Sequence, residues 1–108
     1  MYEQRRLLCI PLNEQGVIDL DYDKKTKNNV YIPFPPEEYK YMMFDTNLFN
    51  TINIECDLLI DDFEEDTIQN ENISIIEKIV KGHEKNIPTF INALNIAREN
   101  KTFVEIIL

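Results

Sequence analysis

The sequence predicts a single α+β domain, residues 1–108, in which a mainly antiparallel sheet of four or five strands packs against about three helices. The length of 108 residues fits one domain, and the hydrophobic content of 44% is sufficient for a core without disulfides or metal. Strand-like patterns lie near both ends of the chain, whereas helical apolar spacing prevails in the middle. The chain shows neither a repeat nor an internal linker.

The first third of the chain is predicted to form three strands. Residues 6–12 are mostly apolar and end near Pro11, which favours a strand. Residues 17–23 alternate between apolar and acidic side chains, which is the period of a half-buried strand, so the two segments predict a β-hairpin. A short third strand is expected at residues 30–34, where prolines stop it. The alternating positions are Ile18, Leu20 and Tyr22 on one face and Asp19, Asp21 and Asp23 on the other.

Three helices are predicted in the rest of the chain. The first covers about residues 36–50, because a proline suits its first turn and apolar residues recur at roughly 3.6-residue spacing. Asn72 is positioned to cap a second helix, and Pro88 to begin a third that ends near Asn100. Residues 102–108 then form a strand that is apolar on both faces except at one glutamate, so it should lie centrally or be covered on both sides.

The net charge of −9 limits the classes of partner. A strongly acidic protein repels nucleic acid and anionic membranes, so neither is an expected partner, and it attracts basic surfaces. Gly16 and Gly82 are the only glycines, which excludes the phosphate-binding loop and the dinucleotide fingerprint. Cys9 and Cys56 form no CxxC pair, so neither a zinc cluster nor a disulfide framework is indicated. Without a signal peptide or an apolar span, the expected location is cytoplasmic, and no cofactor is expected.

The aspartates of residues 19–23 begin like a calcium-binding loop but do not complete one. They have the D-x-D-x-D opening of an EF-hand loop, yet the sixth position is Lys24 where glycine is required. The twelfth position is Val30, where the bidentate glutamate is required. No metal site is therefore predicted, and these carboxylates are expected on the solvent side of a strand.

No residue is assigned a catalytic role, and the protein is expected not to be an enzyme. His83 is the single histidine, and its place in the sequence fits a solvated helix end. Carboxylates beside Cys56 oppose the thiolate that a nucleophile requires, and Cys9 fits a core position. Glu64 and Glu65 could form a catalytic carboxylate pair, but no other group supplies an oxyanion donor or a substrate cradle.

The main functional signal is an acidic run at residues 61–66, which follows a strand-like segment at residues 56–60. Between Tyr41 and Glu77 there is no Lys or Arg, whereas ten acids occur, and seven of them lie within residues 55–66. Asp-x-x-Glu spacings in the run resemble a capping box, so a helix start accounts for two or three of these acids. The remaining charge forms a block that costs stability unless a partner neutralises it. The predicted partner-binding residues are Asp61, Asp62, Phe63, Glu64, Glu65 and Asp66.

Carboxylates around an aromatic side chain suit the docking of a basic protein, because opposite charges speed encounter and the ring adds short-range energy. The run LLIDDFEEDTI, followed by two helices and the closing LNIARENKTFVEIIL, resembles small immunity proteins of bacterial polymorphic and contact-dependent growth-inhibition toxin systems. The likeness covers roughly residues 48–108. It implies a cytoplasmic, non-enzymatic protein that binds and neutralises a cognate toxin domain, here expected to be a basic one of the nuclease type.

Two other classes of function are compatible with the same features. A phage-type inhibitor that mimics nucleic acid would also present carboxylates to a nuclease. A small enzyme or ligand-binding domain would instead show a deep pocket with converging polar groups, whereas a flat acidic surface favours the two binders. The sequence leaves the oligomeric state open.

Overall fold

A four-stranded antiparallel sheet organises the computed structural model, which describes residues 6–108. The strands lie in the order β2-β1-β4-β3, so β4 is central, as expected for the closing strand. With five helices beside this sheet, the predicted α+β class is confirmed. The strands are β1 (Leu7–Pro11), β2 (Asn29–Pro33), β3 (Glu65–Ile68) and β4 (Val104–Ile107).

The connection between β1 and β2 is a helix, α1 (Glu14–Asp21), so the strand predicted at residues 17–23 and its hairpin are wrong. The side chain of Asn13 caps this helix by accepting a hydrogen bond from the Gly16 amide at 2.8 Å. Asp19 is buried and accepts hydrogen bonds from Gln15 and Thr26, so it is not on the wet side of a strand. These local and tertiary hydrogen bonds outweigh the alternating pattern.

Gly16 allows α1 to lie against the chain that leads into β2. A Cβ atom at this position would lie 2.2 Å from the backbone oxygen of Asn28, which is far inside van der Waals contact. The side chain of Asn29 donates to the Gly16 carbonyl oxygen at 2.9 Å, which fixes the same approach. Glycine is therefore used here for close packing.

The helix predicted over residues 36–50 is three elements. They are α2 (Pro36–Lys40), a π-helical turn (Tyr41–Asp45) and α3 (Leu48–Cys56). Thr46 makes the break, since its extended backbone leaves the helical region and its hydroxyl donates to the Tyr41 carbonyl oxygen at 2.8 Å. The same hydroxyl oxygen accepts from the Leu48 amide at 3.3 Å, where α3 begins.

The helices α4 (Ile73–Ile79) and α5 (Pro88–Asn100) confirm the last two predicted helices. The side chain of Asn72 makes no capping hydrogen bond, although its residue precedes α4. The start of α5 is held by Glu38 of α2, whose two carboxylate oxygens accept from the amides of Thr89 and Phe90, each at 3.0 Å. Glu38 is only 4% exposed, so a buried carboxylate satisfies two free amides at a helix start.

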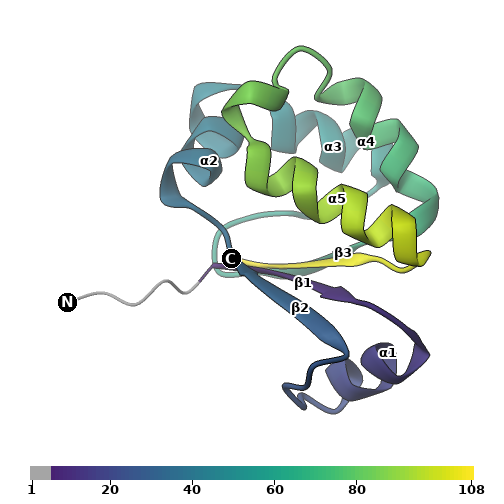
Figure 1. Ribbon diagram of the computed structural model, residues 1–108. Helices are drawn as coiled ribbons and strands as arrows, with labels where there is room; N and C mark the ends of the chain where they lie inside the picture. Colours follow the sequence, from purple (N-terminus) through teal and green to yellow (C-terminus); the bar gives the residue numbers. More distant parts are fainter. Residues whose placement is uncertain (1–5) are drawn as a thin grey trace.

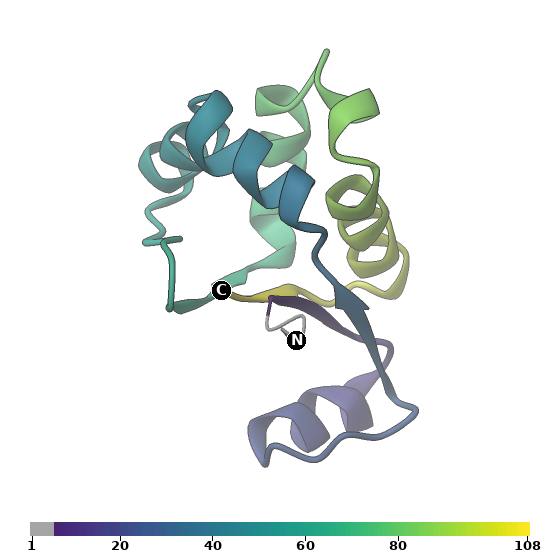
Figure 2. The ribbon, with the colours of Figure 1, turned by 90° about the vertical axis from the view of Figure 1, so that its left-hand side faces the viewer.

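The helices divide unequally between the two faces of the sheet. Figures 1 and 2 show α2, α3, α4 and α5 on one face and α1 on the opposite face. The core lies on the four-helix side, where Phe34, Phe49 and Phe90 have ring centroids 6.2 to 6.3 Å apart. Within residues 6–108, no helix is long and apolar enough to cross a membrane. The second face, which α1 shares with solvent, is the more open one.

Candidate partner-binding site

Residues 61–64 of the acidic run lie on a loop, residues 57–64, which we call the acidic loop, whereas Glu65 and Asp66 begin β3. The loop leaves α3 at Asp57, whose φ of 56° is left-handed and ends the helix. It closes a turn in which the Glu64 amide donates to the Asp61 carbonyl oxygen at 3.3 Å. The carbonyl oxygen of Glu64 then accepts from the Leu108 amide at 2.9 Å, at the point where the chain enters β3. The strand predicted at residues 56–60 and the helix start at 61–66 are therefore both wrong.

The acidic loop is held to the body of the protein at its middle. Asn53 of α3 donates its side-chain amide to the Ile60 carbonyl oxygen at 3.0 Å and accepts from the Ile60 amide at 2.8 Å. The side chain of Ile60 is buried in the core. Asp66 of β3 accepts from the Leu59 amide at 2.7 Å. The loop conformation is thus fixed from α3, from the core and from β3.

Three of the six predicted partner-binding residues stabilise the chain itself. Asp62 forms an ion pair with Arg6, with 3.3 Å between its Oδ1 and Nη2 of the arginine. Asp66 accepts from the Thr67 amide at 2.8 Å in addition to its bond with the Leu59 amide. Asp61 accepts from the amide of its neighbour Asp62 at 2.8 Å. Of these three residues, only Asp61 is exposed.

Apolar side chains stand out from the acidic loop. Phe63 is 79% exposed and has a φ of 64°, which is unusual for a bulky residue and costs about 1 kcal/mol or more. Leu59 is 82% exposed, and Ile54 on the preceding helix is also exposed. Glu64 is exposed beside Phe63. The sequence signal for Phe63 was its place inside the acids, whereas Leu59 was missed because it reads as part of an apolar strand.

Glu65 lies apart from the loop, on the second face of the sheet. The strand register places Tyr31, Cys9, Glu105 and Thr67 in one row across this face. Pro33, Leu7, Ile107 and Glu65 form the neighbouring row. Two adjoining hollows of about 450 and 220 Å³ lie between this face and α1, and we call them together the sheet groove. Both are lined by Leu20, Asp23, Glu65 and Glu105.

Burial changes the titration of groups in the sheet groove. It raises the pKa of the Cys9 thiol to about 12, with the nearby charges of Glu105 and Glu65 as smaller causes, so the thiol is neutral and unreactive at pH 7. The pKa of Glu105 is raised by burial and then by the charges of Glu65 and Asp23. Cys56 outside the groove also has a raised pKa, mainly through burial and secondly through Glu55. Neither thiol suits nucleophilic chemistry.

Two other polar regions are occupied by structural hydrogen bonds. A hollow of about 580 Å³ lies between the start of α1 and the end of α5, but the Asn70 amide in its wall donates to the Thr102 carbonyl oxygen at 2.9 Å. His83 is half-buried, with its Nδ1 2.7 Å from the Tyr41 hydroxyl oxygen, and Asn86 donates to that hydroxyl at 3.1 Å. Within the part of the chain that the structure describes, no group of three His, Cys, Asp or Glu side chains could hold a metal ion.

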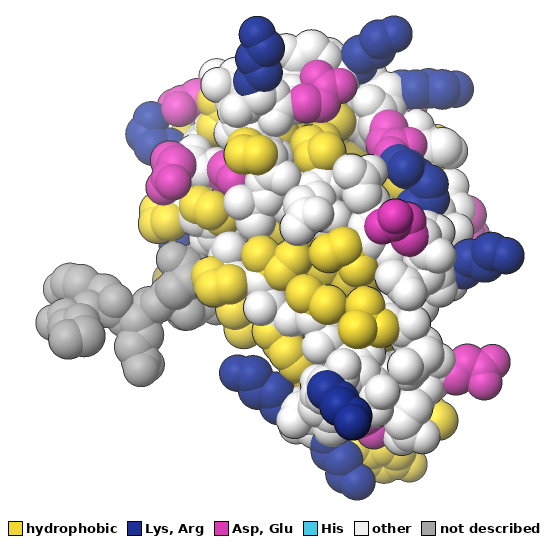
Figure 3. Space-filling model, in the orientation of Figure 1, with side chains coloured by type: hydrophobic (Ala, Val, Ile, Leu, Met, Phe, Trp, Pro, Cys, Tyr) yellow, Lys and Arg dark blue, Asp and Glu magenta, His cyan; other side chains and the backbone are white. Residues whose placement is uncertain are grey.

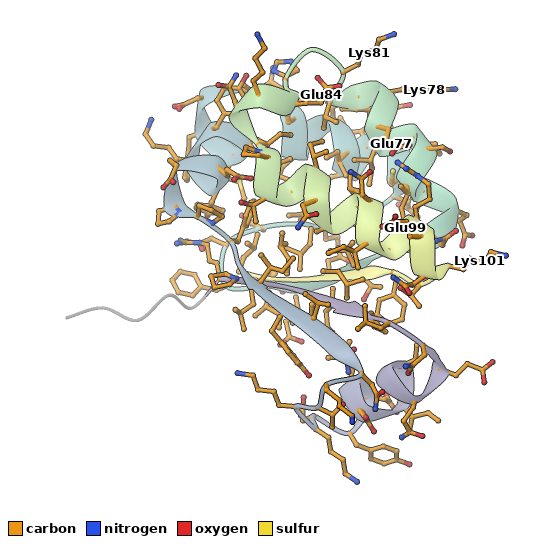
Figure 4. All side chains as sticks on the ribbon, viewed as in Figure 1. Glu77, Lys78, Lys81, Glu84, Glu99 and Lys101 are labelled. Carbon is orange, nitrogen blue, oxygen red and sulfur yellow. The ribbon has the colours of Figure 1, made fainter. Side chains whose placement is uncertain are left out.

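The face that carries α4 and α5 has a mixed charge. Figure 3 shows Lys and Arg side chains interspersed with Asp and Glu across this face. In Figure 4, Lys78, Lys81 and Lys101 point outward among the labelled glutamates. Glu77 of α4 forms an ion pair with Arg98 of α5, which links the two helices. The acidic loop, which has no basic residue, differs from this face in its charge.

Comparisons of the chain with models of protein families, with curated proteins and with solved structures gave no match. The acidic loop, the sheet groove and the charge distribution are the features of the chain that bear on its function.

Proposed function

We propose that this chain is an immunity protein that binds and neutralises a cognate bacterial toxin domain, a basic one of the nuclease type, through the acidic loop. The observation that supports this proposal is a fixed loop on which Phe63 and Leu59 are exposed among carboxylates. The resemblance of the segment 58–68 and the following helices to such immunity proteins agrees with it.

Electrostatics favours a basic partner at this loop. Asp57, Asp61 and Glu64 are exposed, and residues 57–64 contain no Lys or Arg. Opposite charges on a partner speed its encounter with the loop and disfavour partners of the wrong charge. The catalytic cleft of a nuclease is basic because it binds phosphates, so carboxylates can occupy it in place of the substrate.

The exposed apolar side chains can contribute to the free energy of binding when a partner buries them. An exposed phenylalanine that becomes buried in a partner pocket contributes about 2 kcal/mol. Because Asn53 and Asp66 already hold the loop, little conformational entropy remains to be lost when it binds. The left-handed backbone of Phe63 supports the same interpretation, since costly conformations occur often at binding sites.

The test uses the toxin domain encoded next to this chain, defined as the C-terminal domain of the product of the preceding reading frame. Asp61→Lys with Glu64→Lys, and separately Phe63→Ala, are made for co-expression rescue and for calorimetric titration. We expect the double reversal to weaken binding about 100-fold at low salt and Phe63→Ala about 30-fold. Asp62 and Glu65 are left unchanged, because Asp62 pairs with Arg6 and Glu65 lies in the sheet groove.

The matched control is Glu71→Lys with Glu99→Lys, which changes the net charge equally at two exposed residues outside the acidic loop. This control should keep most of the affinity. Equal weakening by both double reversals would mean that only the total charge matters, and unchanged affinity of the loop reversal at low salt would refute the proposal.

A further inference from the structure

The sheet groove has an apolar floor and acidic walls. Leu7 and Ile107 lie side by side in one row of the second face, and Cys9 lies beside Tyr31 in the next. Leu20 of α1 closes the groove from the opposite side. An apolar floor of this kind is suited to aliphatic or aromatic atoms of a ligand.

Among the described residues, the acids that line the groove outnumber the cations. Asp23, Glu65 and Glu105 line both hollows, whereas Lys25 is the single cation among the described lining residues. None of these three carboxylates takes part in an ion pair within the described residues. The raised pKa of Glu105 reflects the same imbalance, because burial and the charges of Glu65 and Asp23 all disfavour its ionised form. A cation placed among these carboxylates would relieve their repulsion.

A cation of the chain itself already contacts an aromatic side chain of the groove. The ammonium group of Lys25 lies 5.3 Å from the ring centroid of Tyr31, which is within the range of a cation–π interaction. Tyr31 is in the same row as Glu105, with Cys9 of β1 between them. Glu65 and Glu105 lie on the adjacent strands β3 and β4, so a planar guanidinium could bond to both carboxylates, which favours arginine over a simple inorganic cation.

We propose that the sheet groove binds an arginine- or lysine-bearing segment of another protein, with its cation between Glu65 and Glu105 and its apolar neighbours on Leu7 and Ile107. This is a second surface, distinct from the acidic loop, and it does not depend on the identity of the toxin. A second copy of this chain is disfavoured as the occupant, because two molecules with a net charge of −9 repel each other.

The test is an NMR titration of the ¹⁵N-labelled protein with a blocked pentapeptide of alternating leucine and arginine. We expect amide shifts concentrated at Cys9, Tyr31 and Glu105. The same peptide with glutamine in place of arginine should bind at least about fivefold more weakly. Glu65→Gln and Glu105→Gln should each weaken the arginine peptide about fivefold.

Glu99→Gln is the matched control, because it removes one charge from an exposed residue that lines neither hollow and lies outside the acidic loop. Shifts centred on residues 57–64, equal binding of the glutamine peptide, or an equal effect of Glu99→Gln would each overturn the proposal. Spermidine binding with equal affinity at the same amides would show a site for small cations instead. A dimer in sedimentation that Glu105→Gln abolishes would place a second copy in the groove. The titration contains no toxin, so its outcome is separate from that of the proposed function.

Discussion

Asn53→Ala tests whether one side chain holds the acidic loop. The substitution removes both hydrogen bonds between α3 and the backbone of Ile60, at 3.0 and 2.8 Å. The Ile60 amide and carbonyl then lose their partners in a partly buried place. The loop would keep the Leu59–Asp66 bond, the Arg6–Asp62 ion pair, the bond from the Leu108 amide to the Glu64 carbonyl oxygen, and the buried Ile60 side chain.

The expected cost follows from these two bonds. Each is worth about 1 kcal/mol, because the groups are neutral and partly accessible to water. Alanine is the better helix former by about 0.5 kcal/mol, which offsets part of the loss within α3. The net destabilisation is therefore about 1.5 kcal/mol. For a chain of 108 residues this lowers the melting temperature by about 6 °C.

Urea unfolding followed by circular dichroism measures the free energy, and hydrogen exchange measures the opening of the Ile60 amide. Asn50→Ala is the control, since Asn50 is exposed on the same helix and gains the same helix propensity. Asn50→Ala should be neutral or stabilising by about 0.5 kcal/mol. If the two variants have the same stability and the same exchange at Ile60, the loop is not held by Asn53 and the case for a pre-ordered binding surface fails.

Two further predictions concern the buried carboxylate of Glu38 and the partly buried carboxylate of Glu105. Glu38→Ala leaves the amides of Thr89 and Phe90 without their acceptor and should cost about 3 kcal/mol in urea unfolding, whereas Glu37→Ala at the exposed neighbour should stay within about 0.5 kcal/mol of the original protein. A small effect of Glu38→Ala would show that the start of α5 does not need the carboxylate. Because the pKa of Glu105 is raised by folding, its ionised form costs stability that appears as the pH rises above the unfolded value of about 4.3. Glu105→Gln should therefore stabilise the protein in thermal melts at pH 8 and have little effect at pH 4, and the reverse order would contradict the assigned cause.

Elements with strong local signals were predictable from the sequence. The helix from Pro88 to Asn100 has a proline at its first turn and a regular apolar stripe, and the structure keeps both bounds. The strand predicted within residues 102–108 is apolar on both faces except at Glu105, and it lies in the centre of the sheet. In these segments the local preference and the tertiary environment agree.

The errors arose where distant residues decide the conformation. The alternation in residues 17–23 predicted a strand, but Thr26 bonds to Asp19 and Gly16 packs closely against the chain that leads into β2, and the segment that makes these contacts is a helix. The Asp-x-x-Glu spacings predicted a helix start, but Leu108 pairs with the backbone of Glu64 and draws the run into the sheet. Neither contact is visible in a window of neighbouring residues.

The same limit applies to the candidate site. The block of acids and the position of Phe63 were readable from the chain, because both are properties of adjacent residues. Asp62 forms its ion pair within the chain with Arg6, which is 56 positions away. The sheet groove was not predictable, since its carboxylates and its aromatic floor come from different strands and from the chain after α1.

The two hydrogen bonds of Asp66 have a consequence for how a partner can be recognised. β3 is an outer strand of the sheet, and such strands are prone to add a foreign strand through their free backbone groups. Here the Thr67 amide is occupied by a carboxylate of its own strand, and the same carboxylate draws Leu59 alongside. Strand addition and aggregation at this border are therefore disfavoured. A partner that binds at this border must therefore be recognised by side chains and not by strand pairing. Single substitutions on the loop can then change the specificity of binding while the sheet stays intact.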